Sequence, residues 1–286
     1  MLTEARTDAV GREQVSQEDD TARVLTELGD AGKRGQPLSS ASKTLALLAA
    51  LGTHGRSFGV TEVAMDIGVP KSTAHRLLKT LEEYNFVART GSRYRAGARL
   101  FELSEVARWS EYGELRDAAY RPLIWLFERS GAIAVHLAVL CGQDVMYLDK
   151  ITRPEGTRLP SRIGGRFPAT CTALGKAILA FSQTAVVEQV LGTPLVRATP
   201  FSITARPQLM DQLDQARSAS FAVEREEACQ GAGCVAAPVL RNAEAIAAVS
   251  LSMPAVGSRA GRDQSLPYGR LAAEAAAAVA DMLPID

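Results

Sequence analysis

The chain contains the segment Pro70-Lys-Ser-Thr-Ala-His-Arg-Leu-Leu-Lys-Thr-Leu-Glu-Glu-Tyr84, around which its N-terminal part is organised. Apolar residues recur along it at helical spacing, at Ala74, Leu77, Leu78 and Leu81. This spacing places them on one face of a helix and leaves the polar residues on the other. Pro70 suits a first helical turn because its missing N–H has no partner there, so the segment predicts an amphipathic helix with an abrupt start.

A second short helix is predicted directly upstream, over Val60–Ile67. Its apolar residues also recur at helical spacing, at Val60, Val63, Ala64 and Ile67. Only Gly68-Val69 separates it from the helix that follows, and glycine permits the sharp bend of a tight turn. Two short helices joined so closely cross steeply, which predicts a helix-turn-helix.

A basic hairpin is predicted directly after the second helix. Phe86–Ala96 reads as two short extended runs around Thr90-Gly91-Ser92, and its arms carry Arg89, Arg93, Tyr94 and Arg95. Residues 40–99 hold nine Lys or Arg against four Asp or Glu, a local net charge of +5, whereas 32 basic and 32 acidic residues balance over the whole chain. This concentration of positive charge next to a helix-turn-helix predicts a winged module with a polyanionic partner.

The length and composition of the chain favour two domains. Its 286 residues are 47% hydrophobic, enough for one large core or two modest ones. No apolar run approaches the roughly 20 residues that cross a bilayer, and the N-terminus lacks the apolar region of a signal peptide, so we expect a cytoplasmic protein without a membrane partner. The four cysteines are expected to be reduced thiols.

The sequence divides into four expected regions. Residues 1–37 are polar and mix both charges, so we expect a disordered tail. A winged helix-turn-helix is expected over 38–98, beginning with a helix over Leu38–Leu51, and a linker helix over 99–111, mainly Arg99–Trp109. An effector-binding and oligomerisation domain is expected over 112–286.

In the C-terminal region the period of the pattern changes from helical to extended. After a helix over 112–129, strands are predicted over Ala132–Leu140 and Asp144–Ile151, and a third over Leu159–Ile163. Two further strands are predicted over Gly233–Leu240 and Ala245–Met253. Predicted helices over 170–181, 207–219 and 271–283 complete an α+β domain built on an antiparallel sheet.

Three phrases in this order resemble the isocitrate lyase regulator (IclR) family of bacterial transcription factors. They are Val69-Pro-Lys-Ser-Thr-Ala-His-Arg-Leu-Leu-Lys-Thr-Leu81, Phe167-Pro-Ala-Thr-Cys-Thr-Ala-Leu-Gly-Lys-Ala177 and Glu226-Glu-Ala-Cys-Gln-Gly-Ala-Gly-Cys-Val-Ala-Ala-Pro-Val239. The resemblance implies a winged helix-turn-helix, a linker helix and a C-terminal domain similar to GAF or PAS domains that binds a small metabolite. It also implies a homodimer or a tetramer built from two dimers. Three positions depart from the family's usual residues, namely Thr170, Ser220 and Met253.

An effector pocket is expected around the start of the helix over 170–181. Thr170, Thr172 and Gly175 lie at the start of this helix. The first N–H groups of a helix have no partner within the helix, so this terminus favours an anion such as a carboxylate. Period-two alternation places Ser250 and Ser252 on one face, opposite Cys234. By resemblance, the positions that match effector-contacting residues are Leu159, Phe167, Ala173, Leu174, Glu224, Cys234, Ser250 and Ser252, and Thr170 joins them as a candidate.

The predicted function is a ligand-responsive transcriptional repressor or activator that senses an organic or aromatic acid. The DNA-contacting candidates are the outward residues of the helix and the hairpin, namely Lys71, Ser72, Thr73, His75, Arg76, Lys79, Arg89, Arg93, Tyr94 and Arg95. One such module covers few base pairs, so a dimer on a palindromic operator is expected, with half-sites roughly 34 Å apart or a multiple of that distance.

Two other functions remain open at this point, an enzyme with a vestigial DNA-binding domain and a metabolite-binding module with a degenerate one. An enzyme is disfavoured because Gly175-Lys176 lacks the other residues of a phosphate-binding loop and no Gly-x-Ser-x-Gly or His-Glu-x-x-His motif occurs. Cys229 and Cys234 would need two more ligands to hold zinc, so we expect no metal and no cofactor. His136, within an apolar run, is expected to be a hydrogen-bonded core residue.

Overall fold

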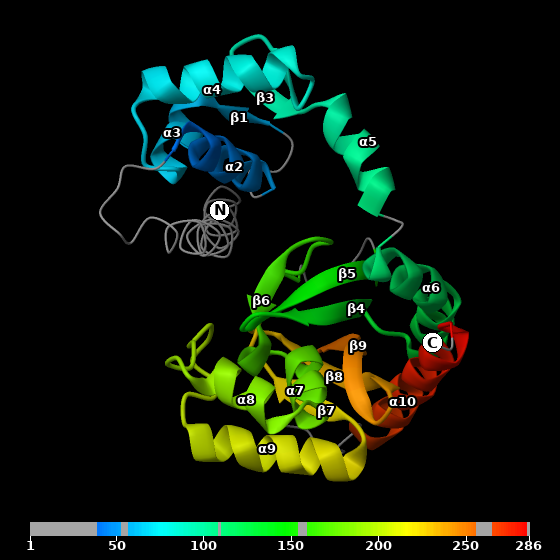
Figure 1. The fold of residues 1–286 in the computed structure, drawn as a ribbon. Coiled ribbons are helices and arrows are strands. Elements are labelled where there is room, and N and C mark those ends of the chain that lie inside the picture. The colour runs from blue at the N-terminus through cyan, green and yellow to red at the C-terminus, as the bar shows by residue number, and fades with distance from the viewer. Residues whose placement is uncertain (1–38, 53–56, 108–109, 154–158, 256–264, 285–286) are drawn as a thin grey trace, which may run out of the picture. The chain divides into compact units, whose positions relative to one another are not determined.

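The structure, a computed structural model, describes residues 39–52, 57–107, 110–153, 159–255 and 265–284 (Figure 1). The expected N-terminal tail, residues 1–37, lies outside the described residues, as do His54 and Trp109. The chain separates into two compact units, Met1–Trp109 and Ser110–Asp286. No helix within the described ranges is long and apolar enough to cross a membrane.

The described part of the first unit has four helices and a small antiparallel sheet. Its elements, in chain order, are α2 (Ser40–Leu51), β1 (Phe58–Gly59), α3 (Val60–Asp66), α4 (Lys71–Glu83), β2 (Val87–Thr90), β3 (Arg93–Ala96) and α5 (Ala98–Ala107). The sheet has the order β1-β3-β2, so the hairpin gains a third strand from the residues just before α3. Sequence reasoning missed this strand because β1 is only two residues long.

The helix-turn-helix packs through the apolar stripe that the sequence predicted. Ala74, Leu77, Leu78 and Leu81 of α4 are buried in one cluster with α2, α3 and β2. Between α3 and α4, Gly68 has φ +62°, a conformation that glycine adopts without strain. The buried stripe fixes which face of α4 is turned outward.

The second unit is a six-stranded antiparallel sheet covered by helices on both faces. Its strands are β4 (Ala134–Cys141), β5 (Asp144–Thr152), β6 (Arg166–Pro168), β7 (Ala222–Arg225), β8 (Ala232–Arg241) and β9 (Glu244–Pro254). The order is β6-β5-β4-β9-β8-β7, which brings β4 beside β9 although more than 100 residues separate them. The fold class is therefore α+β, as predicted.

The two faces of this sheet carry different helices (Figure 1). One face packs against α6 (Glu111–Ser130) and α10 (Ser265–Met282). The other packs against α7 (Ala173–Ala180), α8 (Thr184–Leu191) and α9 (Arg206–Ala219). Neighbouring residues of a strand enter opposite clusters, as Leu137 and Ala138 do, because side chains alternate across a strand.

Four parts of the second unit differ from the sequence prediction. Residues 159–163 form no strand, and the edge strand is β6 instead. The helix predicted from 170 begins at Ala173, because a short 3₁₀ turn, η2 (Ala169–Cys171), precedes it. Sequence reasoning also missed α8 and β7, which are eight and four residues long and carry weak periodic signals.

Candidate functional site

The outer face of α4 presents a row of polar and cationic side chains. Lys71, Ser72, His75, Arg76 and Lys79 are all exposed, whereas Thr73 is half-buried. Within the described part of the chain, no side chain of the module forms an ion pair or hydrogen bond with the Lys71, Arg76 or Lys79 side chains. Their charges are therefore available to an external anion.

The wing hairpin holds its arginines in three different environments. Arg89 donates from Nε to the carbonyl of Gly91 at 2.9 Å, and its guanidinium lies 6.0 Å from the centre of the Tyr94 ring. This contact folds the Arg89 side chain toward the turn of the hairpin. Arg95 is exposed, and no hydrogen bond or ion pair joins its side chain to another described residue.

Arg93 is bound within the module. Its guanidinium makes two hydrogen bonds to the carboxylate of Glu62, at 3.0 and 3.1 Å, and two more to the hydroxyl and the carbonyl of Ser57. Glu62 also accepts the N–H of Gly59 at the start of α3. Arg93 thus ties β3 to the first helix of the helix-turn-helix, and its predicted contact with phosphate would have to compete with these bonds.

The prediction that Tyr94 contacts DNA is not supported by the structure. Its side chain is only 2% exposed, and its ring stacks on Phe58 at a centroid distance of 6.1 Å. The pairing of Phe58 with Tyr94 across β1 and β3 turns the ring into the core. Because sequence reasoning missed β1, it treated both faces of the hairpin as exposed.

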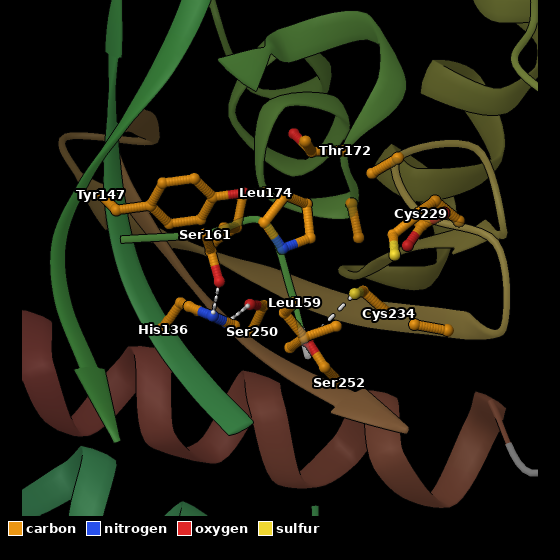
Figure 2. A pocket seen from close by; sticks show the side chains of 15 residues that line it. His136, Tyr147, Leu159, Ser161, Thr172, Leu174, Cys229, Cys234, Ser250 and Ser252 are labelled. Carbon is orange, nitrogen blue, oxygen red and sulfur yellow. Dashed lines mark hydrogen bonds between the residues drawn. The ribbon is translucent and has the colours of Figure 1, made fainter. Parts of the chain in front are cut away.

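A pocket lies in the second unit, between the sheet and the N-terminus of α7 (Figure 2). Strand pairing aligns two transverse rows of side chains on its floor. One row is Glu224, Cys234 and Ser252, and the other joins His136 to Ser250. Its cavity volume is about 30 Å³, where one water needs roughly 10–15 Å³.

His136 forms hydrogen bonds to one residue at the rim of the pocket and to one on its floor (Figure 2). Its Nε2 lies 2.8 Å from the hydroxyl of Ser161, and its Nδ1 lies 3.4 Å from the hydroxyl of Ser250. Lys150 donates from Nζ to the carbonyl of Ser161 at 2.6 Å. Burial, with the nearby charge of Lys150 as a second cause, lowers the pKa of His136 to about 3, so the imidazole is neutral at physiological pH.

The start of α7 supplies backbone donors to the pocket. Thr172 caps the helix by accepting the N–H of Gly175 at 2.9 Å. Among the described residues, no acceptor is hydrogen-bonded to the N–H groups of Ala173 and Leu174, and both residues line the pocket. These two donors at a positive helix end favour an anionic group.

A buried acidic pair, Glu224 and Glu227, lies beside the pocket. Glu224 lines it and accepts the N–H of Glu227 at 2.8 Å. The carboxylate of Glu227 is in turn paired with Lys176 of α7, whose Nζ lies 2.6 and 2.7 Å from its two oxygens. Burial is the main cause that raises the pKa of Glu224 to about 7.

Both units match families of known regulators. Residues 40–91 match the IclR helix-turn-helix domain, and residues 112–280 match the C-terminal domain of the bacterial transcriptional regulator IclR. The chain belongs to the IclR family. It is 34% identical over 232 residues to the HTH-type transcriptional regulator KdgR of Escherichia coli, covering 79% of this chain and 86% of that one. It is 30% identical over 249 residues to the glycerol operon regulatory protein of Streptomyces griseus, covering 85% and 93%.

Solved IclR-family structures share the fold over most of the chain. An IclR homologue from Microbacterium hydrocarbonoxydans, in complex with 4-hydroxybenzoate, has a TM-score of 0.75 at 25% identity and covers 86% of this chain and 99% of its own. Thermotoga maritima IclR has a TM-score of 0.68 at 29% identity and covers 85% and 98%. The chain is therefore a ligand-responsive transcriptional regulator of the IclR type.

Seven of the nine effector-binding candidates line the pocket of this IclR-family domain. They are Leu159, Ala173, Leu174, Glu224, Cys234, Ser250 and Ser252. Phe167 and Thr170 do not line it. Phe167 lies in the edge strand β6, and Thr170 is buried in η2, because the helix begins at Ala173 and Thr172 takes the capping position.

Sequence reasoning missed several residues that line the pocket, chiefly His136, Tyr147, Ser161 and Cys229, whereas Thr172 lies at the helix start where it was expected. His136 reaches the pocket because β4 lies beside β9, a pairing that no local pattern reveals. The one available signal was its position as a single polar residue in an apolar run. No group of three side chains in the described ranges could hold a metal ion.

Proposed function

We propose that this regulator binds a palindromic DNA operator as a dimer, or as a tetramer of two dimers, and responds to a small organic acid. The observation that supports DNA binding most directly is the exposed face of α4. There Lys71, Arg76 and Lys79 stand outward without partners among the described residues, above a buried apolar stripe. In a winged helix-turn-helix the second helix enters the major groove, where Lys71, Ser72, Thr73, His75 and Arg76 would lie near base edges.

The first experiment measures sequence preference at Arg76. Arginine that reads a guanine through two hydrogen bonds contributes about 1–3 kcal/mol of discrimination. Arg76→Ala should therefore weaken binding to the operator more than binding to random duplex. Arg270→Ala is the matched control, because Arg270 is an exposed arginine in the other unit. Equal losses on operator and random DNA would contradict a base contact by Arg76.

We propose that the effector is a carboxylate held at the N-terminus of α7. The N–H groups of Ala173 and Leu174 supply donors there, and Ser250 and Ser252 add hydroxyl groups from the floor of the pocket. The related homologue bound to 4-hydroxybenzoate supports an acid that also carries a polar group at its far end.

Thermal-shift screening against small carboxylates tests this part of the proposal. An acid that binds should raise the melting temperature of the wild-type protein, and Ser250→Ala should reduce that rise because it removes a hydroxyl from the pocket. Ser218→Ala is the control, since Ser218 is an exposed serine of α9 outside the pocket. A panel without a single stabilising acid would contradict the carboxylate proposal.

A further inference from the structure

Among the described residues that line the effector pocket, none carries a cationic side chain that could balance the charge of an acid. Of the described residues that line it, only His136 and Glu224 could change charge near neutral pH, and His136 is held neutral by burial. Lys150 reaches only the carbonyl of Ser161 at the rim and does not line the cavity. An anionic effector would therefore share the pocket with Glu224.

The charges beside Glu224 leave an excess of one negative charge. Lys176 is 1% exposed and is engaged by both oxygens of Glu227, with Gln212 as a third acceptor. When ionised, Glu224 and Glu227 together carry −2, and Lys176 carries +1, so the net charge is −1. A bound carboxylate would bring the net charge of this buried site to −2. The additional negative charge and the burial both disfavour the ionised form of a carboxyl group.

The other titratable groups that face Glu224 do not change their charge near pH 7. Cys234 on β8, Cys229 after β7 and Tyr147 on β5 all have their pKa values raised, mainly by burial. They are therefore neutral and stay neutral around pH 7. Glu224 is itself 2% exposed, lines the cavity, accepts one backbone N–H from Glu227 at 2.8 Å and has the side chain of Cys234 as a second hydrogen-bond partner.

We propose that Glu224 takes up one proton when a carboxylate enters the pocket and then donates a hydrogen bond to it, so that effector and proton bind together. The proton comes from solvent, and no covalent bond is made or broken. Glu224 is then the residue that makes the pocket accept an acid rather than a cation. This inference rests on the proposed carboxylate effector.

The pKa of Glu224, raised to about 7 by its burial, sets the range in which this linkage is measurable. If only the protonated form admits a carboxylate, the effector Kd is nearly constant below pH 6 and rises about tenfold between pH 6 and pH 8. Uptake at pH 8 should approach about 0.9 proton for each effector bound, and at pH 6 it should be close to zero.

The experiment is isothermal titration calorimetry of the full chain at pH 6 and pH 8. At pH 8 the titration is carried out twice, once in phosphate and once in Tris. The probes are acetate, pyruvate, benzoate and 4-hydroxybenzoate, and the acid that stabilises the protein most in a thermal shift is used for calorimetry. The difference in heat between the two buffers, which release protons with different enthalpies, gives the number of protons taken up.

Two pocket variants separate a proton linkage from a general loss of affinity. Glu224→Gln keeps the shape and a hydrogen-bond donor but cannot titrate, so proton uptake and the pH dependence of Kd should both disappear. Ser252→Ala removes a hydroxyl from the same row of the sheet, so it should weaken binding equally at both pH values and leave the proton uptake intact.

The possible results distinguish this inference from the proposed function. A carboxylate that binds without proton uptake, or with proton release, would overturn the role of Glu224 and leave the carboxylate effector standing. If none of the four acids stabilises the protein at either pH, the carboxylate proposal fails and the inference fails with it. Should Glu224→Gln not fold, uptake by the wild-type protein and by Ser252→Ala decides the matter.

Discussion

At the scale of single residues, the three arginines of the wing differ in what surrounds their guanidinium groups. Arg89 bends back to the turn at Gly91, and Arg93 is bound to Glu62, whereas Arg95 has no partner among the described residues. The sequence pattern does not distinguish these three arginines, which all belong to one basic hairpin. The structure separates a side chain that can reach phosphate from one that positions the hairpin.

This difference predicts different salt dependence for two alanine variants. Arg95→Ala should lower the slope of log K against log salt concentration by about 0.9 on random duplex, since one phosphate contact is lost. Arg93→Ala should leave that slope unchanged and reduce the stability of the module by less than about 1 kcal/mol, because its ion pair is half-exposed. Fluorescence anisotropy over a salt series measures both slopes, and equal changes would contradict the assignment.

Because the pKa of Glu224 is raised, the free energy of unfolding should depend on pH even without effector. Its pKa is raised from 4.5 to about 7 in the folded protein, so between these values the folded state binds more protons than the unfolded state. Its contribution to the free energy of unfolding is therefore most favourable below pH 4.5 and is lost as the pH rises through 7. Glu224→Gln should raise stability at pH 8 by up to about 3 kcal/mol and have little effect below pH 5.

Thermal melts of the wild-type protein and of Glu224→Gln at pH 5 and pH 8 check this prediction. Glu244→Gln is the control, because it makes the same chemical change at an exposed glutamate of the β8–β9 turn. An equal effect of Glu224→Gln at both pH values would show that the carboxyl group does not titrate in this range.

At the scale of elements, the start of α7 is shaped by close contact between two backbones. A Cβ on Gly175 would lie 2.1 Å from the carbonyl oxygen of Ala169, so only glycine allows η2 to pack against α7. Gly175→Ala should therefore displace the helix start, weaken effector binding and destabilise the protein by about 1–3 kcal/mol or more. Chemical denaturation measures the loss of stability.

The matched control for this substitution is Gly59→Ala in the other unit. A Cβ there meets the Glu62 side chain at an ordinary distance of 3.5 Å, and φ is −98°. It should cost much less than Gly175→Ala and should leave effector affinity unchanged. An unchanged effector affinity in Gly175→Ala would contradict the role of the α7 N-terminus.

The turn between β8 and β9 carries backbone strain that a substitution can remove. Asn242 and Ala243 both have positive φ, at 51° and 65°. A two-residue hairpin turn with positive φ at both positions favours Asn-Gly, since alanine is strained there. Ala243→Gly should therefore stabilise the second unit by about 0.5–1 kcal/mol, as the denaturation midpoint measures.

The control for Ala243→Gly is the same change two residues later, in β9. Ala245 lies within the strand, where glycine costs roughly 0.5–1 kcal/mol, so Ala245→Gly should have the opposite sign. Destabilisation by both substitutions would show that the turn conformation is not a source of strain.

At the scale of the whole molecule, the proposed function requires that the two sites are coupled. An effector changes DNA affinity only if it binds two states of the protein differently, and such coupling is typically about 1–3 kcal/mol, or roughly 5–150-fold. Saturating effector should change operator affinity by a factor in this range. Operator DNA should change effector affinity by the same factor, because the linkage is reciprocal.

Two titrations measure this coupling, effector with and without operator, and operator with and without effector. Ser252→Ala serves as the control, since it should shift the effector concentration that is required without changing operator affinity in the absence of effector. An effector that binds tightly and leaves operator affinity unchanged would contradict the proposed regulatory response.

Much of the fold could be predicted from local patterns. The stripe of Ala74, Leu77, Leu78 and Leu81 specifies one buried face of α4, and the alternating strands after residue 132 predict an antiparallel sheet. Both follow from the 3.6-residue and two-residue periods of side-chain direction, which act within a few residues. Short elements such as β1, β7 and α8 carry too few residues to show a period.

The sequence by itself determined the fold class, the family and the outward face of α4, because each depends on residues that are close together in the chain. Only the tertiary structure decided which residues line the pocket, that Tyr94 is buried and that Arg93 is bound by Glu62. These outcomes depend on the pairing of β4 with β9 and of β1 with β3, and on the burial that follows. Long-range pairing decides the neighbours and the solvent exposure of a side chain, and these in turn set its charge and its hydrogen-bond partners.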